Sequence, residues 1–416
     1  MDKKLLDFGR IGITLSFFAS TLLYATNGDN LIGVGTKARG MGGAGIAVHH
    51  GAESILQNPA LITDVENTEV SFGGTIFMPD IKTQLNTNPQ APLPLQNKLT
   101  SDADFNIIPE VSLAQKINKN FYIGVGMWGT AGMGVDYSQG EGIRNTISVG
   151  QFSNFDMVTN LQLMQFAVPI AYKANGLSVA IAPILQYGNL DINYAMPIDQ
   201  QGTINSFGAG LAQDLGFGCS IGLIYDFSNG LSAGAVYKSK IDIEYTNQLT
   251  TATVPFGIIL SEGDHLQQPA ELGIGLAYTM GQHTFAVDYK NIKWSDSKGY
   301  QDFGWVDQHV MAFGYEFSQD NWTLRAGYNH GSSPVKETAN PAINMFNLLG
   351  FPATAKQHYT IGGTYEITHQ LSIDLAYVYS PTATKTFDVS QLGMGIDTVT
   401  TDHLESSASF QLTYRF

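Results

Sequence analysis

The sequence has one cysteine, little charge and, beyond its start, no long apolar run. Cys219 alone excludes a disulfide within one chain and a cysteine metal cluster, and we expect it to pack inertly in a strand. Only 14% of the 416 residues are charged, which is low for a protein surrounded by water. The absence of a later run of about eighteen apolar residues excludes a helical membrane protein. The net charge of −15 disfavours nucleic acid as a partner.

The first 25 residues have the pattern of a secretory signal peptide, which we predict to span 1–25. A basic start precedes the apolar stretch 11–24, and Ala25 is a suitable cleavage residue. A short anchoring helix is the alternative, because Leu23 is unusual three places before the cut. No cysteine follows the cut, which excludes a lipoprotein.

The C-terminal segment 404–416 alternates between apolar and polar residues with a period of two. Its apolar positions are Leu404, Ala408, Phe410, Leu412, Tyr414 and Phe416, with Ser406 as the exception among even numbers. A strand with an apolar outer face, aromatic edges and a terminal Phe is typical of an outer-membrane β-barrel. Alone, it fits a half-buried strand of a soluble sandwich equally well.

The same alternation recurs along the rest of the chain. We predict strands at 68–79, 105–116, 121–131, 157–174, 177–193, 214–227, 230–247, 266–280, 282–294, 305–318, 321–330, 357–367, 370–380 and 404–416. Short turns separate every second pair of strands, and longer loops separate the others. This spacing predicts an all-β fold: a transmembrane antiparallel β-barrel of about 14 strands over 68–416, crossing the bacterial outer membrane, with both termini periplasmic.

Residues 26–67, between the signal and the first strand, do not have the sequence pattern of barrel strands. They are rich in glycine and hold too few large apolar residues to fold alone. The stretch Gly40-Met41-Gly42-Gly43-Ala44-Gly45 matches the dinucleotide pattern GxGxxG, but no βαβ unit follows it, so we predict no nucleotide and no other cofactor. Pro59 in Asn58-Pro59-Ala60 should end a short helix over 52–57. The same three residues recur at 340–342, so the Asn-Pro-Ala sequence alone does not identify a particular structure.

Together these features resemble the FadL/TodX family of outer-membrane transporters for long-chain fatty acids and aromatic hydrocarbons. Weaker similarities lie at 293–296, 324–329, 351–352 and 358–363. The resemblance implies that 26–67 form a hatch inside the lumen. It assigns to the hatch the motif residues Gly40, Gly42, Gly43, Gly45, Asn58, Pro59 and Ala60.

The family likeness also implies a mechanism and a set of partners. A hydrophobic molecule would be caught by extracellular loops and would leave sideways through a gap at a kinked third strand, by passive diffusion gated by the hatch. The partners would be hydrophobic small molecules and the surrounding lipid and lipopolysaccharide, and the barrel would act as a monomer. Here the third strand contains Gly124, Gly126, Gly129 and Gly132. Glycine within a strand permits a bulge, although ordinary barrel glycine is the alternative for each.

Apolar residues in three predicted extracellular loops are candidates for substrate binding, because exposed apolar patches often mark binding sites. The candidates are Phe207, Leu211, Phe256, Ile258, Leu260, Phe346 and Leu349. The alternative is that these residues only pack the loops together. A sheltered path matters because the polar lipopolysaccharide layer, rather than the hydrocarbon core, is the obstacle for an alkyl chain.

A carboxylate head group would require a cation in the lumen. The alternation of the strands places Arg325, Lys238, Lys240 and Lys290 inward, and we select Arg325 as the candidate. One alternative is that an inward acidic residue pairs with each of these cations. Another is that the substrate is an uncharged hydrocarbon.

No motif supports catalysis, so we predict that the protein is not an enzyme. The chain has neither a nucleophile elbow nor an HExxH pair. An outer-membrane lipase is a formal alternative. His49 and His50 are adjacent, and we predict no metal there. The alternatives outside catalysis are a general diffusion porin, which needs no plug, and a surface adhesin, which gives no reason for apolar clusters in several loops.

Overall fold

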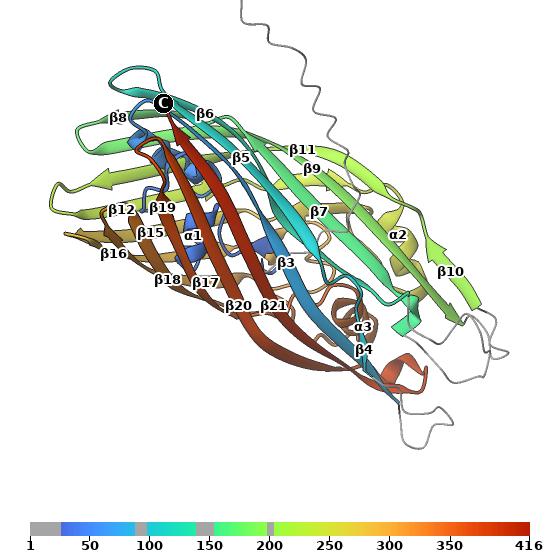
Figure 1. The fold of residues 1–416 in the computed structure, drawn as a ribbon. Coiled ribbons are helices and arrows are strands. Elements are labelled where there is room, and N and C mark those ends of the chain that lie inside the picture. The colour runs from blue at the N-terminus through green and yellow to red at the C-terminus, as the bar shows by residue number, and fades with distance from the viewer. Residues whose placement is uncertain (1–25, 88–97, 139–153, 198–203) are drawn as a thin grey trace, which may run out of the picture.

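A computed structural model describes residues 26–87, 98–138, 154–197 and 204–416. The predicted signal peptide, 1–25, lies outside the described residues and stays a prediction. Fourteen antiparallel strands close into a barrel, as predicted (Figure 1). In chain order the wall consists of β3 (Thr68–Thr87), β5 (Asn106–Lys116), β6 (Phe121–Asp136), β7 (Val158–Ala167) continued by β8 (Ile170–Ala174), β9 (Leu177–Pro197), β11 (Ala212–Asp226), β12 (Leu231–Lys238), β15 (Glu271–Met280), β16 (His283–Ile292), β17 (Gln308–Gln319), β18 (Trp322–Gly331), β19 (Gln357–Glu366), β20 (Leu371–Asp388) and β21 (Ile396–Arg415). Strand β21 pairs with β3 and completes the wall.

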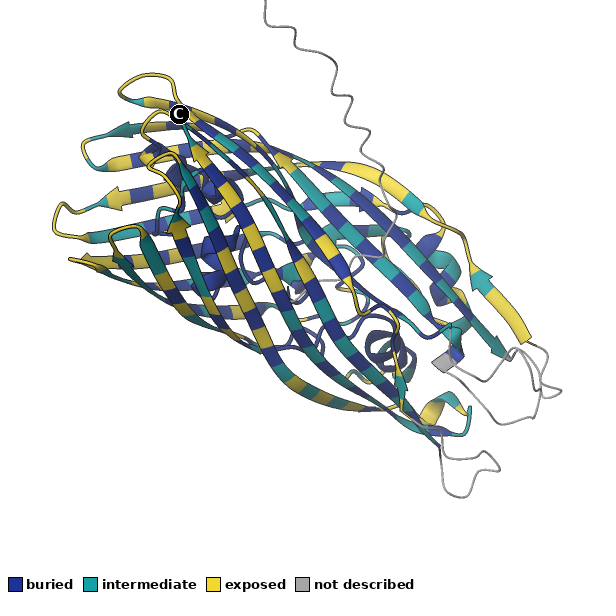
Figure 2. Ribbon diagram, in the orientation of Figure 1, coloured by how far each residue is buried: buried dark blue, intermediate teal, exposed yellow. Residues whose placement is uncertain are grey.

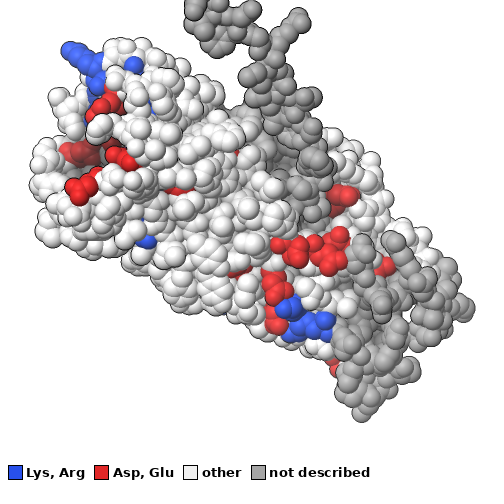
Figure 3. Space-filling view, in the orientation of Figure 1, with Lys and Arg blue, Asp and Glu red and all other residues white. Residues whose placement is uncertain are grey.

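The wall carries its apolar side chains outside and its polar side chains inside. In β21, Phe410 and Leu412 are 42% and 37% exposed, whereas Gln411 between them is 1% exposed. Alternating exposed and buried stripes run along the strands in Figure 2. On the face drawn in Figure 3, charged side chains gather mainly toward the two ends, and the middle is largely free of them. This pattern fits a barrel with lipid around its middle.

Several strands extend beyond their predicted extracellular ends. Strand β3 reaches Thr87, β20 reaches Asp388, and β21 begins at Ile396. The outer face of β20 changes from Leu375 and Tyr377 to polar residues above Ser380. The outer faces of the upper strands are therefore polar, whereas inner-face residues such as Leu85, Phe387 and Val399 are buried. The apolar-outside alternation that marks a membrane strand is lost there. The sequence pattern could not define these ends.

Two predicted strands contain breaks. The predicted strand 157–174 is divided between β7 and β8 at Val168 and Pro169. The hairpin 230–280 is interrupted after β12 and before β15, and its upper part forms a small sheet of β13 (Ile241–Glu244) and β14 (His265–Gln268). A Cβ atom added to Gly216 or Gly218 on the inner face of β11 would lie 2.6 Å from Ile241. The hairpin therefore bends into the lumen.

The lumen contains the N-terminal segment 26–67, called the hatch below. It consists of β1 (Thr26–Asn27), β2 (Asn30–Leu31), α1 (Thr36–Gly40), η1 (Gly51–Leu56) and η2 (Pro59–Asp64). Most of its side chains are buried, and α1 lies inside the ring of strands in Figure 1. Helix η1 ends before Asn58, as the proline pattern predicted. None of the described helices has the length and apolarity needed to cross a membrane.

Loops with short helices fill the extracellular half. They carry α2 (Gln248–Thr253), η4 (Val254–Phe256), η5 (Trp294–Asp296), α3 (Pro341–Gly350) and η6 (Ser390–Leu392), and η3 (Asn154–Asp156) precedes β7. Helix α3 is drawn within the barrel outline in Figure 1, and its side chains from Met345 to Leu349 are all buried.

Candidate functional site

The glycine motif of the hatch lies directly against glycines of the wall. A Cβ atom added to Gly327 would lie 2.1 Å from the backbone nitrogen of Gly42, and one added to Gly362 would lie 3.0 Å from the Cα of Gly40. Gly314 faces Met41 in the same way, at 2.9 Å. Backbone therefore packs on backbone across β17, β18 and β19, which explains the run of glycine without a nucleotide.

Side chains of the wall hold this backbone in place. Thr360 accepts a hydrogen bond from the Gly42 amide at 2.8 Å and donates one to the Gly40 carbonyl at 3.0 Å. Asp288 accepts from the amides of Gly45 and Ile46 at 2.7 and 2.9 Å. In these hydrogen bonds the glycine motif thus contributes backbone amides and a carbonyl, and the barrel wall contributes polar side chains.

Asn58 joins the second hatch motif to the wall. Its side-chain oxygen accepts from the Ala60 amide at 3.1 Å, which caps η2, and Pro59 occupies the first position of that helix. Its amide group donates to the carbonyls of Ile46 and Leu223 at 2.8 and 3.1 Å. Asn340 makes the same local cap before Ala342, at 2.9 Å. Asn58 differs because it also binds the wall strand β11.

The histidine pair is also held by the hatch. His49 Nδ1 lies 3.2 Å from the Leu61 carbonyl, and His50 Nε2 lies 3.2 Å from the Ala44 carbonyl. Burial lowers the pKa of His50 to about 3, with nearby Arg325 acting in the same direction. His50 is therefore neutral at physiological pH, and both rings serve the packing of the hatch.

Charged side chains fill the space between hatch and wall. Arg39 pairs with Glu110, and the backbone amide of Lys37 donates to Glu53 at 3.0 Å. Burial raises the pKa of Glu53 to about 7, although Lys37 opposes this shift. The first pair connects α1 with the wall strand β5, and the second connects α1 with η1.

The structure separates Arg325 from the predicted apolar candidates. Arg325 binds Glu316 at 2.7 Å and Thr364 at 2.6 Å, and its side chain lies against Gly40 of the hatch. Lys238 pairs with Glu271 at 3.3 Å, and Lys240 pairs with Asp296 at 2.9 Å. Three of the four inward cations thus have acidic partners. Lys290, the fourth, is 5% exposed and lies near Glu271, whose charge acts on it.

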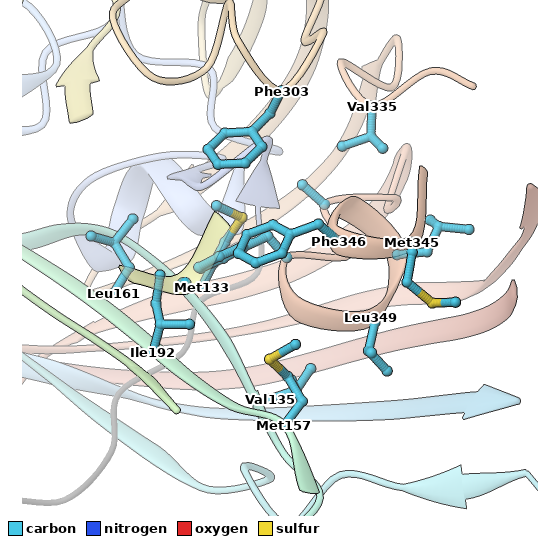
Figure 4. Packing of buried hydrophobic residues seen from close by; sticks show 14 of the residues in the cluster. Met133, Val135, Met157, Leu161, Ile192, Phe303, Val335, Met345, Phe346 and Leu349 are labelled. Carbon is cyan, nitrogen blue, oxygen red and sulfur yellow. The ribbon is translucent and has the colours of Figure 1, made fainter. Parts of the chain in front are cut away.

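Most of the predicted loop residues do come together. Ile258, Phe346 and Leu349 are buried in one apolar cluster of the extracellular half, and Phe207, Phe256 and Leu260 pack against it. We call this group the loop cluster; Figure 4 shows part of it, with Phe303 and Phe346 face to face at 5.2 Å between ring centroids. Leu211 is 56% exposed and does not belong to the cluster.

The predicted candidates did not include the residues that the β16–β17 loop contributes to the loop cluster. Tyr300, Phe303 and Trp305 of the β16–β17 loop are buried in it, together with Trp294. The available signal was the aromatic density of 294–305. Barrel residues such as Met133, Leu161 and Ile192 complete the cluster from the wall (Figure 4).

The wall is incomplete beside the third barrel strand, β6. Strand β5 pairs with β6 only from Tyr122 to Trp128. On its other side, the register of β6 with β7 shifts between Gly129 and Ala131, so Thr130 is an extra residue. A bulge thus lies between two of the glycines that the sequence had suggested.

The start of the hatch occupies this incomplete section. Asn30 of β2 pairs with Ala131, and the Gly132 amide donates to the Asp29 carbonyl at 3.0 Å. A cavity of about 50 Å³ adjoins this contact and is lined by residues that include Asn30, Thr130 and Lys238. The hatch hairpin therefore replaces the missing wall neighbour of β6.

Asp29 connects this section with the loop cluster. It is 0% exposed, and its Oδ2 accepts hydrogen bonds from Tyr300 and, at 2.9 Å, from Gln268. Its Oδ1 has no hydrogen-bond partner within the described residues. Burial raises the pKa of Asp29 to about 7, although the hydrogen bond from Tyr300 lowers it. One carboxyl group thus joins an extracellular loop to the backbone beside the wall break.

Comparison with known proteins identifies the family to which this barrel and hatch belong. The profile of a family described as outer membrane protein transport protein (OMPP1/FadL/TodX) matches residues 25–416. The chain belongs to this family. It is an outer-membrane transport protein, and the outer-membrane localisation and the FadL/TodX resemblance are confirmed.

Relatives of this FadL/TodX protein are distant in sequence. Outer membrane protein P1 of Haemophilus influenzae is 27% identical over 183 residues, which cover 39% of this chain and 38% of that protein. The long-chain fatty acid transport protein of Escherichia coli O6:H1 is 22% identical and is covered to 82%, with 80% of this chain. The solved toluene transporter TodX of Pseudomonas putida superposes with a TM-score of 0.70 at 19% identity, covering 94% of this chain and all of that one. This last likeness concerns the fold.

Proposed function

We propose that this FadL/TodX protein carries long-chain fatty acids across the lipopolysaccharide layer by passive diffusion and releases them sideways through the wall beside β6. The observation that carries the proposal is the wall break between β5 and β6, where Asn30 of the hatch hairpin pairs with Ala131 on the open edge of β6. Movement of that hairpin opens a lateral path toward lipid. The domain limits 26–67 and 68–416, the hatch motif residues and the monomeric state belong to the same proposal.

The energetics favour a lateral path over an axial one. Each buried methylene group stabilises an alkyl chain by about 0.8 kcal/mol, so a chain held in the loop cluster loses this energy on entering water. The axial path leads through charged groups such as Lys37, Glu53 and Arg39, all of which are buried below the cluster. Sideways exit transfers the chain directly from apolar side chains to lipid.

The hatch argues against a general diffusion porin. A porin lumen holds water along its axis, whereas the interior here is occupied by side chains such as Met41, Ile46 and Ile55, each 0% exposed. Catalysis has no support in the family likeness, which is to transport proteins. Uncharged aromatic hydrocarbons are the second candidate substrates, because the likeness to a toluene transporter favours them.

The test is uptake of labelled oleate by cells that produce the protein. Uptake should exceed that of cells lacking the protein, and deletion of residues 52–62 should abolish this excess while leaving an assembled barrel. Steady ionic current through the intact protein in a planar bilayer, without oleate uptake, would contradict the proposal and favour a porin. Uptake of labelled toluene in place of oleate would select the second candidate.

A further inference from the structure

Glu405 is a fully buried carboxylate on the inner face of the wall strand β21. Its neighbours are two histidines: His358 Nε2 lies 3.1 Å from Oε2, and His403 Nε2 lies 3.0 Å from Oε1. Within the described residues, Glu405 forms no ion pair with a lysine or an arginine. Burying a carboxylate is costly unless a cation pairs with it, and a histidine is a cation only when protonated. The carboxylate therefore favours a further cation beside it.

One oxygen of this carboxylate is left without a donor. The Nδ1 atom of His403 donates to the Pro352 carbonyl at 2.8 Å, so the neutral ring carries no proton on Nε2, which faces Oε1. Accordingly, Oε1 of Glu405 accepts no hydrogen bond within the described residues. A donor that carries positive charge would satisfy Oε1 and neutralise the carboxylate at the same time.

The backbone nitrogen of Thr26 lies on the other oxygen. It donates to Glu405 Oε2 at 3.2 Å, and Thr26 is itself buried. A backbone amide has a single N–H group, so this contact satisfies one oxygen only. The start of the hatch thus already lies within hydrogen-bonding distance of the buried carboxylate.

Thr26 is also the residue at which the predicted signal peptide is removed. Hydrolysis of the bond between Ala25 and Thr26 gives Ala25 a carboxyl group and leaves Thr26 with an α-amino group, which takes up a proton. An α-amino group is mostly protonated at pH 7, whereas an imidazole of ordinary pKa is mostly neutral there. Removal of the signal therefore replaces one neutral N–H donor by an ammonium group with three N–H donors at the position of Glu405.

This contact and the Asn30 contact hold the β1–β2 hairpin to two parts of the wall. Thr26 binds β21, which is the neighbour of β3, whereas Asn30 pairs with Ala131 of β6. A cavity of about 20 Å³ is lined by Thr26, by His403 and by residues of β3 and β6. The two ends of the hairpin are thus fixed independently of each other.

We propose that the α-ammonium group formed at Thr26 by signal removal pairs with Glu405, beside His358 and His403, and fixes the start of the hatch to β21. Glu405 is then a positioning residue for the hatch and does not contact substrate. The pairing itself is independent of the substrate, and only its effect on uptake rests on the proposed function. A hydrogen bond to an ionised donor is roughly twice as strong as a neutral one, so signal removal strengthens the attachment.

The experiment measures hydrogen–deuterium exchange by mass spectrometry in four proteins: the wild type, a form with one serine inserted between Ala25 and Thr26, Glu405→Gln, and the combination of both changes. The inserted serine keeps the amide N–H of Thr26 and moves the ammonium group about 3.8 Å along the chain. Intact mass establishes each N-terminus. Amides of 27–34 should exchange about tenfold faster in the inserted form and in Glu405→Gln, because each loses a charge-assisted hydrogen bond. In the Glu405→Gln background the insertion should have no additional effect.

The contrary outcomes are equally distinct. A wild-type protein whose mass begins at a residue other than Thr26 would overturn the proposal, as would equal exchange in the wild type and the inserted form. An effect of the insertion that persists undiminished in Glu405→Gln would assign it to crowding by the extra residue and exclude the pairing. Oleate uptake by the wild type tests the proposed function separately, since its absence would leave the exchange result standing. Heat-modifiable migration on gels checks that each variant is an assembled barrel.

Discussion

Single residues determine whether the hatch fits the wall, and Gly42 is the strictest case. Its φ is +69°, and a Cβ atom there would lie 2.7 Å from the Tyr328 amide nitrogen. Gly393 has the same φ of +69° with nothing within 4 Å. Gly42→Ala should therefore displace the hatch and raise ionic current in a planar bilayer, whereas Gly393→Ala should cost only backbone strain of about 1 kcal/mol. Equal behaviour of the two variants would show that contact with the wall is unimportant.

Asn58 offers a second comparison between matched residues. Asn58→Ala removes an N-cap worth about 1 kcal/mol and two further hydrogen bonds of about 1 kcal/mol each. Asn340→Ala removes the equivalent cap of α3 without a bond to the wall. Amides of 40–62 should exchange with deuterium faster in Asn58→Ala and at the wild-type rate in Asn340→Ala, measured by mass spectrometry. Unchanged exchange in Asn58→Ala would exclude it as an anchor.

At the level of elements, the β1–β2 hairpin meets three parts of the molecule: β6, β14 and the β16–β17 loop. Asp29 makes all three contacts: its carboxylate accepts from Tyr300 and Gln268, and its carbonyl accepts from Gly132. Tyr300 and Tyr245 are the titratable groups on which the charge of Asp29 acts. Because the pKa of Asp29 is about 7 when buried and 3.8 ordinarily, the docked hairpin holds a proton that a released hairpin loses between these values. Docking therefore weakens as pH rises through this window.

This pH dependence can be measured as ionic current between pH 5 and pH 8. Current through the wild type should increase as pH rises, and Asp29→Asn should reduce the increase. Burial also raises the pKa of Glu53 to about 7, so this residue acts in the same direction. Glu53→Gln should therefore remove a separate part of the increase in current with pH. A wild-type profile in Asp29→Asn would contradict the assignment to Asp29.

For the whole molecule, the prediction concerns the position of the hatch against the wall. Asn30 and Ala131 are Cα partners, so Asn30→Cys with Ala131→Cys in a Cys219→Ser background should form a disulfide. Oleate uptake should stop in the oxidised protein and return after reduction. The matched control joins two wall strands through Ser71→Cys and Thr413→Cys, which are also Cα partners and should not affect uptake. Uptake through the oxidised Asn30 variant would exclude exit beside β6.

Much of the fold was predictable because lipid and a polar lumen impose a period of two on each strand. The strands, their faces and the short-turn side all follow from this local pattern, and the inward position of Arg325 was correct. The upper ends of β3, β20 and β21 were not predictable, since their outer faces are polar and their apolar side chains lie on the inner face. The breaks around Thr130 and Pro169 also required the pairing of neighbouring strands.

The sequence by itself determined a barrel for the outer membrane with a glycine-rich segment unable to fold alone, because these properties depend on local composition and alternation. Only the tertiary structure decided that Arg325 pairs with Glu316 and that Asn30 covers the break at Ala131. Such contacts join residues far apart in the chain. Closure of the barrel brings them together, and no local pattern encodes that closure.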